Sequence, residues 1–165
     1  MIDIQITQYV RELLFDIQNK AYIIGQSKLS DSGKTAETVY NIQESDDIDD
    51  NYQVKRSLTS AYSTLLSALS EYLSSNNTKA DDIIKPEIEK YGTLIINLSL
   101  PDNFDNTSLD SLNDSIHDYL VAKSLGDWFT MTNNKEDAEV YLAQSAVYLT
   151  KILNAVFKRK RPKKV

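Results

Sequence analysis

The chain contains one short motif that ends like a phosphate-binding loop. Residues 32–35 read Ser-Gly-Lys-Thr, and in such loops glycine amides wrap a phosphate while the lysine reaches its outer oxygens. The motif also requires a glycine five positions before Gly33, where this chain has Lys28. Because no apolar strand ending in aspartate follows either, we interpret residues 32–35 as loop sequence and not as a nucleotide site.

An acidic run at residues 44–51 could supply oxygen ligands to a hard cation. Its five carboxylates are those of Glu44, Asp46, Asp47, Asp49 and Asp50. A calcium-binding loop needs glycine at its sixth position and glutamate at its twelfth. Counted from Asp46, these positions hold Asn51 and Ser57, so the motif fails. We expect the acids to charge the start of the helix that follows.

The chain has a single histidine, His117, and no cysteine. Metal sites built from several histidines or from thiolates are therefore excluded. His117 follows an apolar residue in a helical pattern, which predicts a partly buried structural imidazole and not a general base. We accordingly predict no catalytic residue, no metal site and no cofactor, and we expect that the protein is not an enzyme.

The strongest charge feature is the basic C-terminal tail, residues 158–165. The chain holds 18 Lys and Arg against 24 Asp and Glu, a net charge of -6. Six of the cations lie in the tail, so residues 1–157 are strongly acidic; these are Lys158, Arg159, Lys160, Arg161, Lys163 and Lys164. We expect Pro162 to end the last helix and to leave the residues after it mobile.

Three interpretations of the tail stay open. It is a solvated helix terminus, a contact with nucleic-acid phosphates, or a segment that docks on an acidic protein surface. Its charges are not interleaved with aromatic residues. This pattern favours sequence-independent contact with a phosphate backbone over stacking on single-stranded bases.

Periodic apolar residues predict four long helices that position these groups. The stripes fall within residues 6–24, 54–72, 109–128 and 138–156, each with the three- and four-residue steps of an amphipathic helix. Gly25 is expected to cap the first of them.

The segments between these helices are polar or interrupted. Residues 26–50 predict a long polar loop inserted into a single helical domain, residues 1–157. Residues 80–91 contain Pro86 and predict a short broken helix.

The last two helices are joined by a short turn, which predicts an antiparallel helical hairpin. Its seam is expected to contain the aromatic side chains of Tyr119, Trp128, Phe129, Tyr141 and Tyr148. Most of these side chains should be hairpin core, and any that are exposed would anchor an interface.

One segment departs from the helical pattern. Residues 93–100 alternate, with Leu94, Ile96, Leu98 and Leu100 on one face, which predicts a strand. A lone strand needs a partner for its backbone groups. The N-terminal residues Ile2, Ile4 and Ile6 also alternate and could pair with it; alternatively it pairs with another subunit, or it is extended coil.

The overall prediction is an all-α fold, a small bundle of about four long helices with this one extended segment. The first residues lack the pattern of a signal peptide, and no apolar run reaches membrane-spanning length. We therefore expect a soluble protein made in the cytoplasm that contacts no membrane.

From residue 98 onward the chain resembles the head-tail connector (adaptor, or head completion) proteins of tailed bacteriophages and prophages, especially those of Bacteroides-type phages. These have an extended segment, a helix of the form hDYLvakaLgdWf, a short turn, a second helix with spaced Tyr and Leu, and a basic RkrP end. The matching residues are Asp118, Tyr119, Leu120, Leu125, Trp128, Phe129, Tyr141, Leu149, Arg159, Arg161 and Pro162.

The resemblance implies a structural virion protein at the neck of a phage particle, made in the host bacterial cytoplasm. Copies of such a protein form a homo-oligomeric ring of about twelve subunits. The ring lies beneath the portal protein, extends the channel for packaged double-stranded DNA and presents a platform for tail or other neck proteins. The tail would then dock on the portal or a neighbour, or touch DNA phosphates.

An alternative from a different class is a cytoplasmic helical-bundle binding module. Such a module would contact duplex DNA or an acidic partner through the tail, with binding that ignores sequence and falls steeply with salt.

Overall fold

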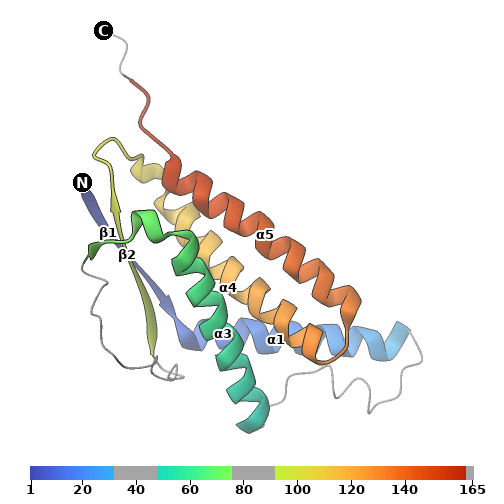
Figure 1. Cartoon of the computed structure of the whole chain (residues 1–165). Helices are drawn as coiled ribbons and strands as arrows, with labels where there is room; N and C mark the ends of the chain where they lie inside the picture. The colour runs from blue at the N-terminus through green and yellow to red at the C-terminus, as the bar shows by residue number, and fades with distance from the viewer. Residues whose placement is uncertain (32–47, 76–91, 163–165) are drawn as a thin grey trace.

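The computed structural model describes residues 1–31, 48–75 and 92–162. In these ranges the chain is mostly helical, as predicted, with four α-helices and one small antiparallel sheet (Figure 1). In chain order the long elements are β1 (Ile2–Tyr9), α1 (Val10–Asp31), α3 (Ile48–Ala68), β2 (Thr93–Leu100), α4 (Leu109–Met131) and α5 (Lys135–Phe157). Two short 3-10 helices, η1 (Ser70–Tyr72) and η3 (Asn106–Ser108), follow α3 and precede α4.

The predicted strand pairs within the chain. β2 lies antiparallel to β1 in a register that runs from Ile2 opposite Leu100 to Tyr9 opposite Thr93. The alternating leucines and isoleucine of β2 face the core, where all four are buried. Residues 6–9 are therefore strand and not the start of a helix, because β2 needs their backbone groups as partners.

The other edge of β2 is also contacted by the chain itself. Leu73 forms a β-bridge with Leu98, and the Ser74 amide donates to the Asn97 carbonyl at 2.9 Å. The alternation also allowed residues 93–100 to pair with another subunit. In the structure they pair with residues of the same chain instead.

The loop predicted at residues 26–50 is shorter than expected. α1 continues through Gly25 to Asp31, and α3 begins at Ile48; residues 32–47 lie outside the described part. Gly25 is buried inside the helix and does not cap it. The end of α1 is fixed by tertiary contacts instead, since the Lys28 ammonium bonds Asn134 and pairs with Asp137 at the start of α5. The predicted broken helix at residues 80–91 also lies outside the described part.

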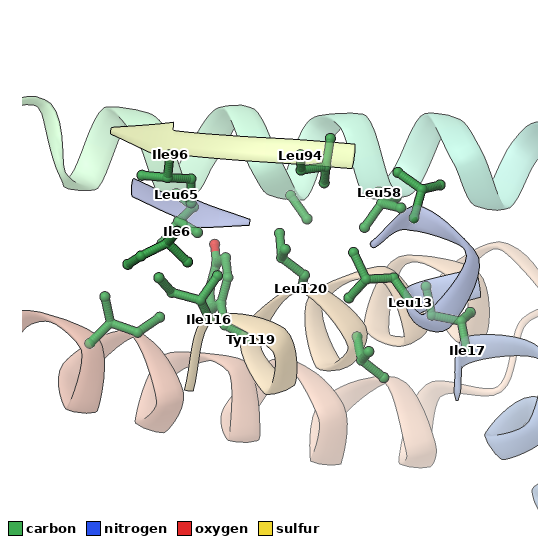
Figure 2. Packing of buried hydrophobic residues seen from close by; sticks show 14 of the residues in the cluster. Ile6, Leu13, Ile17, Leu58, Leu65, Leu94, Ile96, Ile116, Tyr119 and Leu120 are labelled. Atoms are coloured by element: carbon green, nitrogen blue, oxygen red, sulfur yellow. The ribbon is translucent and has the colours of Figure 1, made fainter. Parts of the chain in front are cut away.

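α4 lies at the centre of the helices. α1 and α3 contact it, and α5 packs along it as an outer layer, on the side away from α3 and the sheet (Figures 1 and 2). The core fills the space between these layers. Figure 2 shows side chains from the sheet and from α1, α3 and α4 meeting there: Ile6, Leu13, Ile17, Leu58, Leu65, Leu94, Ile96, Ile116, Tyr119 and Leu120.

The hairpin predicted for the last two helices is confirmed by the packing of α5 against α4. Asn133 in the turn has φ of 58°, a left-handed conformation that asparagine tolerates better than most residues. The Asn134 amide reaches back to the Phe129 carbonyl at 2.8 Å and closes the end of α4. Gly126 lets the helices approach, because a Cβ atom there would lie 2.6 Å from Leu142 Cδ2.

Candidate interaction surfaces

The first three residues of the tail are held against the chain. The Asp105 amide donates to the Lys158 carbonyl at 3.3 Å, and the Lys160 amide donates to the Asn103 carbonyl at 2.8 Å. Phe104 and Arg159 form a β-bridge between these two bonds. We call this arrangement the tail clamp; it joins residues 103–105 to residues 158–160.

Side chains support the clamp. The Asp105 carboxylate accepts hydrogen bonds from the Thr107 hydroxyl and amide and lies 3.6 Å from the Lys158 ammonium. The Thr107 bonds first, and the Lys158 charge after them, lower the pKa of Asp105. The Arg159 guanidinium donates to the Val156 carbonyl at 2.8 Å, which satisfies a terminal carbonyl of α5.

The tail prediction is thereby corrected in one respect. α5 ends at Phe157, five residues before Pro162, because the clamp draws the chain into an extended conformation. Among the six cations, Lys158 and Arg159 bond to the chain itself, while Lys160 and Arg161 have exposed side chains. Lys163 and Lys164 lie outside the described residues.

The aromatic residues of the hairpin divide into two groups. Tyr119, Trp128 and Phe129 on α4 are buried, at 2%, 5% and 0% exposure. Tyr141 and Tyr148 on α5 are half-buried against the same core. The ring centroids of Phe129 and Tyr141 lie 5.7 Å apart. Burial raises the pKa of Tyr119 and of Tyr141. Most of these side chains are therefore hairpin core, as predicted.

His117 is a partly buried imidazole at a junction of three elements, as predicted. Its Nε2 atom lies 2.6 Å from Asp16 Oδ2 on α1, and its Nδ1 atom lies 3.2 Å from Gln8 Oε1 on β1. The Gln8 amide nitrogen donates to the Asn113 carbonyl and side-chain oxygens. Sequence reasoning missed Gln8 and Asp16 because both lie more than 100 residues from His117.

This network ties β1 and α1 to α4, which gives it a structural role. It borders an open hollow lined by Arg11, Glu12 and Phe15. In the described part of the chain, no group of three or more Asp, Glu or His side chains could hold a metal ion. Residues 32–35 and the acids at positions 44–47 lie outside that part, so neither motif can be placed.

A second open hollow lies between α3 and α4. Asp127 lines it together with Gln53, Arg56, Ser57 and Ser60. Burial raises the pKa of the Asp127 carboxyl, against a smaller lowering by the Lys123 charge. The sequence carried no signal for this group, because its neighbours across the hollow come from a helix some seventy residues earlier.

The outward face of α5 is the apolar surface that sequence reasoning did not single out. Of the 23 residues in α5, only Ala138, Ser145, Ile152 and Val156 are buried. Val140 and Val147 are 51% and 55% exposed. By length and composition alone α5 could cross a membrane. Of the 18 residues in its most apolar stretch, 17% are buried in the structure. The prediction that no apolar run reaches membrane-spanning length did not anticipate a helix that passes this test of length and composition.

Comparisons with protein-family models, with curated proteins and with solved structures found no match to this chain.

Proposed function

We propose that this protein is a structural virion component, a ring-forming connector that joins the portal vertex of a phage head to the tail. The observation that carries the proposal is the resemblance of residues 98–164 to head-tail connectors. Its most characteristic residues are Trp128 and Phe129 on α4 and Tyr141 on α5. These three side chains occupy the hairpin seam, so the resembling residues are also the ones that hold the hairpin together.

The charge distribution fits this role. An acidic body lines a DNA channel without binding the duplex, because the wall and the phosphates repel each other. The tail clamp fixes the point at which the basic residues leave the subunit. In this proposal Arg161 and the residues after it bind the portal protein, a neighbouring subunit or DNA phosphates.

The proposal is tested by quantitative mass spectrometry of purified phage particles, counting this chain against the capsid protein. A ring at a single vertex predicts on the order of a dozen copies per particle. Absence from particles, or a copy number that matches the capsid protein, would overturn the connector role.

The role of the tail is tested separately with two truncations. A chain ending at Lys160 keeps the clamp and loses the distal cations, whereas a chain ending at Phe157 loses both. We expect both truncated chains to fold and both to bind portal rings more weakly than the full chain. Normal portal binding by the chain ending at Lys160 would show that residues 161–165 have no part in docking.

A second candidate is a binding module that contacts duplex DNA or an acidic partner through the tail. The exposed side chains of Lys160 and Arg161 at the end of the clamp favour it. It predicts binding to duplexes of any sequence, weakening steeply between about 50 and 200 mM salt. No binding at the lower salt concentration would exclude DNA as the partner.

A further inference from the structure

Gln8 is a polar residue on the core-facing side of β1, which it shares with Ile2, Ile4 and Ile6. Its side chain is buried, at 4% exposure, so its amide group must find hydrogen-bond partners within the protein. The amide nitrogen donates to the Asn113 backbone carbonyl at 3.1 Å and to the Asn113 Oδ1 atom at 2.8 Å. Because a backbone carbonyl only accepts, these bonds fix which end of the Gln8 amide is the nitrogen.

The Gln8 oxygen in turn determines where the imidazole of His117 carries a hydrogen. With the amide nitrogen turned to Asn113, the Gln8 Oε1 atom faces the Nδ1 atom of His117 at 3.2 Å. An amide oxygen accepts and does not donate, so this bond requires a hydrogen on Nδ1. Without that hydrogen a buried oxygen would lose its donor. We therefore place a hydrogen on Nδ1 for as long as the fold is intact.

The other ring nitrogen faces a carboxylate. His117 Nε2 lies 2.6 Å from Asp16 Oδ2 on α1. An ionised carboxylate only accepts, so this contact requires a second hydrogen, on Nε2. A ring with hydrogen on both nitrogens is the imidazolium cation. In the neutral ring, whose hydrogen stays on Nδ1, the lone pair of Nε2 would point at a negatively charged oxygen and be repelled by it.

The other charged groups near the ring are of both signs. Arg11 and Glu12 of α1 line the same open hollow as Asp16 and the imidazole. From β1 the ring meets the neutral amide of Gln8, and Asp114, one turn earlier on α4, is exposed to solvent. The Asp16 carboxylate is in direct contact with Nε2 and is therefore the charge that acts on this nitrogen most strongly.

We propose that the contact between His117 of α4 and Asp16 of α1 is a proton-dependent switch. With a proton on Nε2, the ring binds Asp16 and Gln8 at once and ties both α1 and β1 to α4. When that proton leaves, the ring keeps its bond to Gln8 and loses the bond to Asp16. The Asp16 side chain is 38% exposed, so water solvates the released carboxylate while the fold stays intact. The switch does not depend on the connector role, because all of its groups belong to one chain.

NMR of the ring nitrogens tests the switch directly, because His117 is the single histidine of the chain. Long-range proton–nitrogen spectra of the ¹⁵N-labelled full chain are recorded between about pH 5 and 9, the range in which histidines titrate. We expect both nitrogens to carry hydrogen at the acidic end. As pH rises, Nε2 should become the bare nitrogen while Nδ1 keeps its hydrogen. A neutral ring with a bare Nδ1 would overturn the proposal.

Unfolding measurements test whether the contact with Asp16 is coupled to the proton. The contact exists in the folded chain alone, so the folded chain holds this proton more tightly than the unfolded chain does. The stability it contributes is therefore lost as pH rises above about 6.5, where an unfolded histidine loses its proton. Urea unfolding should show that the folding equilibrium constant drops about fivefold between about pH 6 and 8.5. A constant that stays level or rises would contradict the switch.

Asp16→Asn assigns the drop to the proposed contact. An asparagine amide accepts from a protonated Nε2 and donates to a bare one, so this variant keeps α1 tied to α4 across the range and should lose most of the drop. Glu12→Gln, which removes a carboxylate from the same hollow, is the matched control and should retain it. A drop of equal size in the Asp16→Asn chain would assign the pH dependence to other groups and overturn the proposal.

Amide exchange tests which element is released. Protection factors, corrected for the intrinsic pH dependence of exchange, are compared between about pH 6 and 8.5. They should fall in the turn of α1 around Asp16 and stay unchanged in β1 around Gln8, because the bond from Nδ1 survives. Loss of protection around Gln8 alone, or equal loss at both places, would contradict a switch that acts on α1.

Discussion

The two helices of the C-terminal hairpin have equal length and opposite surroundings. α4 and α5 each contain 23 residues, of which twelve are buried in α4 and four in α5. α4 contacts α1, α3 and α5, whereas the main helical contact of α5 is α4 (Figure 1). The difference follows from position, since α4 is central and α5 is the outer layer.

Apolar content and burial are separate properties in this hairpin. α5 is apolar enough to qualify as a membrane-spanning helix, yet most of its surface is outside the core. In α4 most apolar side chains are buried against other elements of the same chain. In α5 several of them are exposed, among them Val140, Val147 and Phe157.

The largest effect that separates the two helices should come from their phenylalanines. Phe129→Ala on α4 removes a fully buried ring and should lower the free energy of unfolding by about 3–5 kcal/mol. Phe157→Ala on α5, 57% exposed, should cost about 1 kcal/mol through its edge-to-face contact with Tyr72. Urea unfolding of both variants at low micromolar concentration measures the difference. Equal losses would show that α5 is as deeply packed as α4.

The next effect concerns the close contact between the helices. Gly126→Ala should lower the free energy of unfolding by about 1 kcal/mol, because displacement of Leu142 outweighs the better helix propensity of alanine. In a Leu142→Ala background the same change should stabilise, since the colliding side chain is gone. Urea unfolding of the parent chain, the two single variants and the double variant gives the coupling free energy between positions 126 and 142. Additive effects would mean that the helices separate without cost.

A smaller, pH-dependent effect should come from the buried carboxyl of α4. Because burial raises the folded pKa of Asp127, its ionisation costs stability as pH rises above the unfolded value of about 3.9. Asp127→Asn should therefore gain stability relative to the parent chain between pH 3.5 and 7. Urea unfolding across this range measures the trend. An advantage that shrinks as pH rises would contradict it.

The smallest effect should be local to the clamp at the end of α5. Because hydrogen bonds lower the folded pKa of Asp105, the stability that its carboxylate contributes is present above about pH 3.9 and is lost as pH falls through the folded pKa. Amide exchange of Lys160, followed by NMR, should accelerate at low pH beyond its intrinsic pH dependence. Asp105→Ala should produce the same loss of protection at neutral pH.

Asp102→Ala is the matched control in the same loop, because Asp102 pairs with the N-terminal amine at 2.5 Å and not with the tail. It should leave Lys160 protected. Equal exchange in both variants would mean that Asp105 does not hold the clamp.

The predictable features were those recorded in local periodicity. Steps of three and four residues placed the four long helices, and alternation of Leu94, Ile96, Leu98 and Leu100 placed β2. The short turn placed the hairpin, with Trp128 and Phe129 inside it. Such patterns state that one face of a segment is buried. They do not state which segment covers it.

The tertiary structure decided the remainder, because each missed feature depends on contacts between residues far apart in the chain. β1 exists because β2 requires a partner, although its last residues continue an apolar pattern that also fits a helix. α1 passes Gly25 because Lys28 is held by Asn134 and Asp137. The tail leaves α5 at Phe157 because residues 103–105 bind it.

Local patterns in the sequence therefore predict a helical hairpin, an alternating strand and an acidic chain with a basic end. Packing against α4 determines which apolar face of α5 is buried. α5 carries apolar residues around most of its circumference, so its periodicity alone does not distinguish the face packed on α4 from the exposed face.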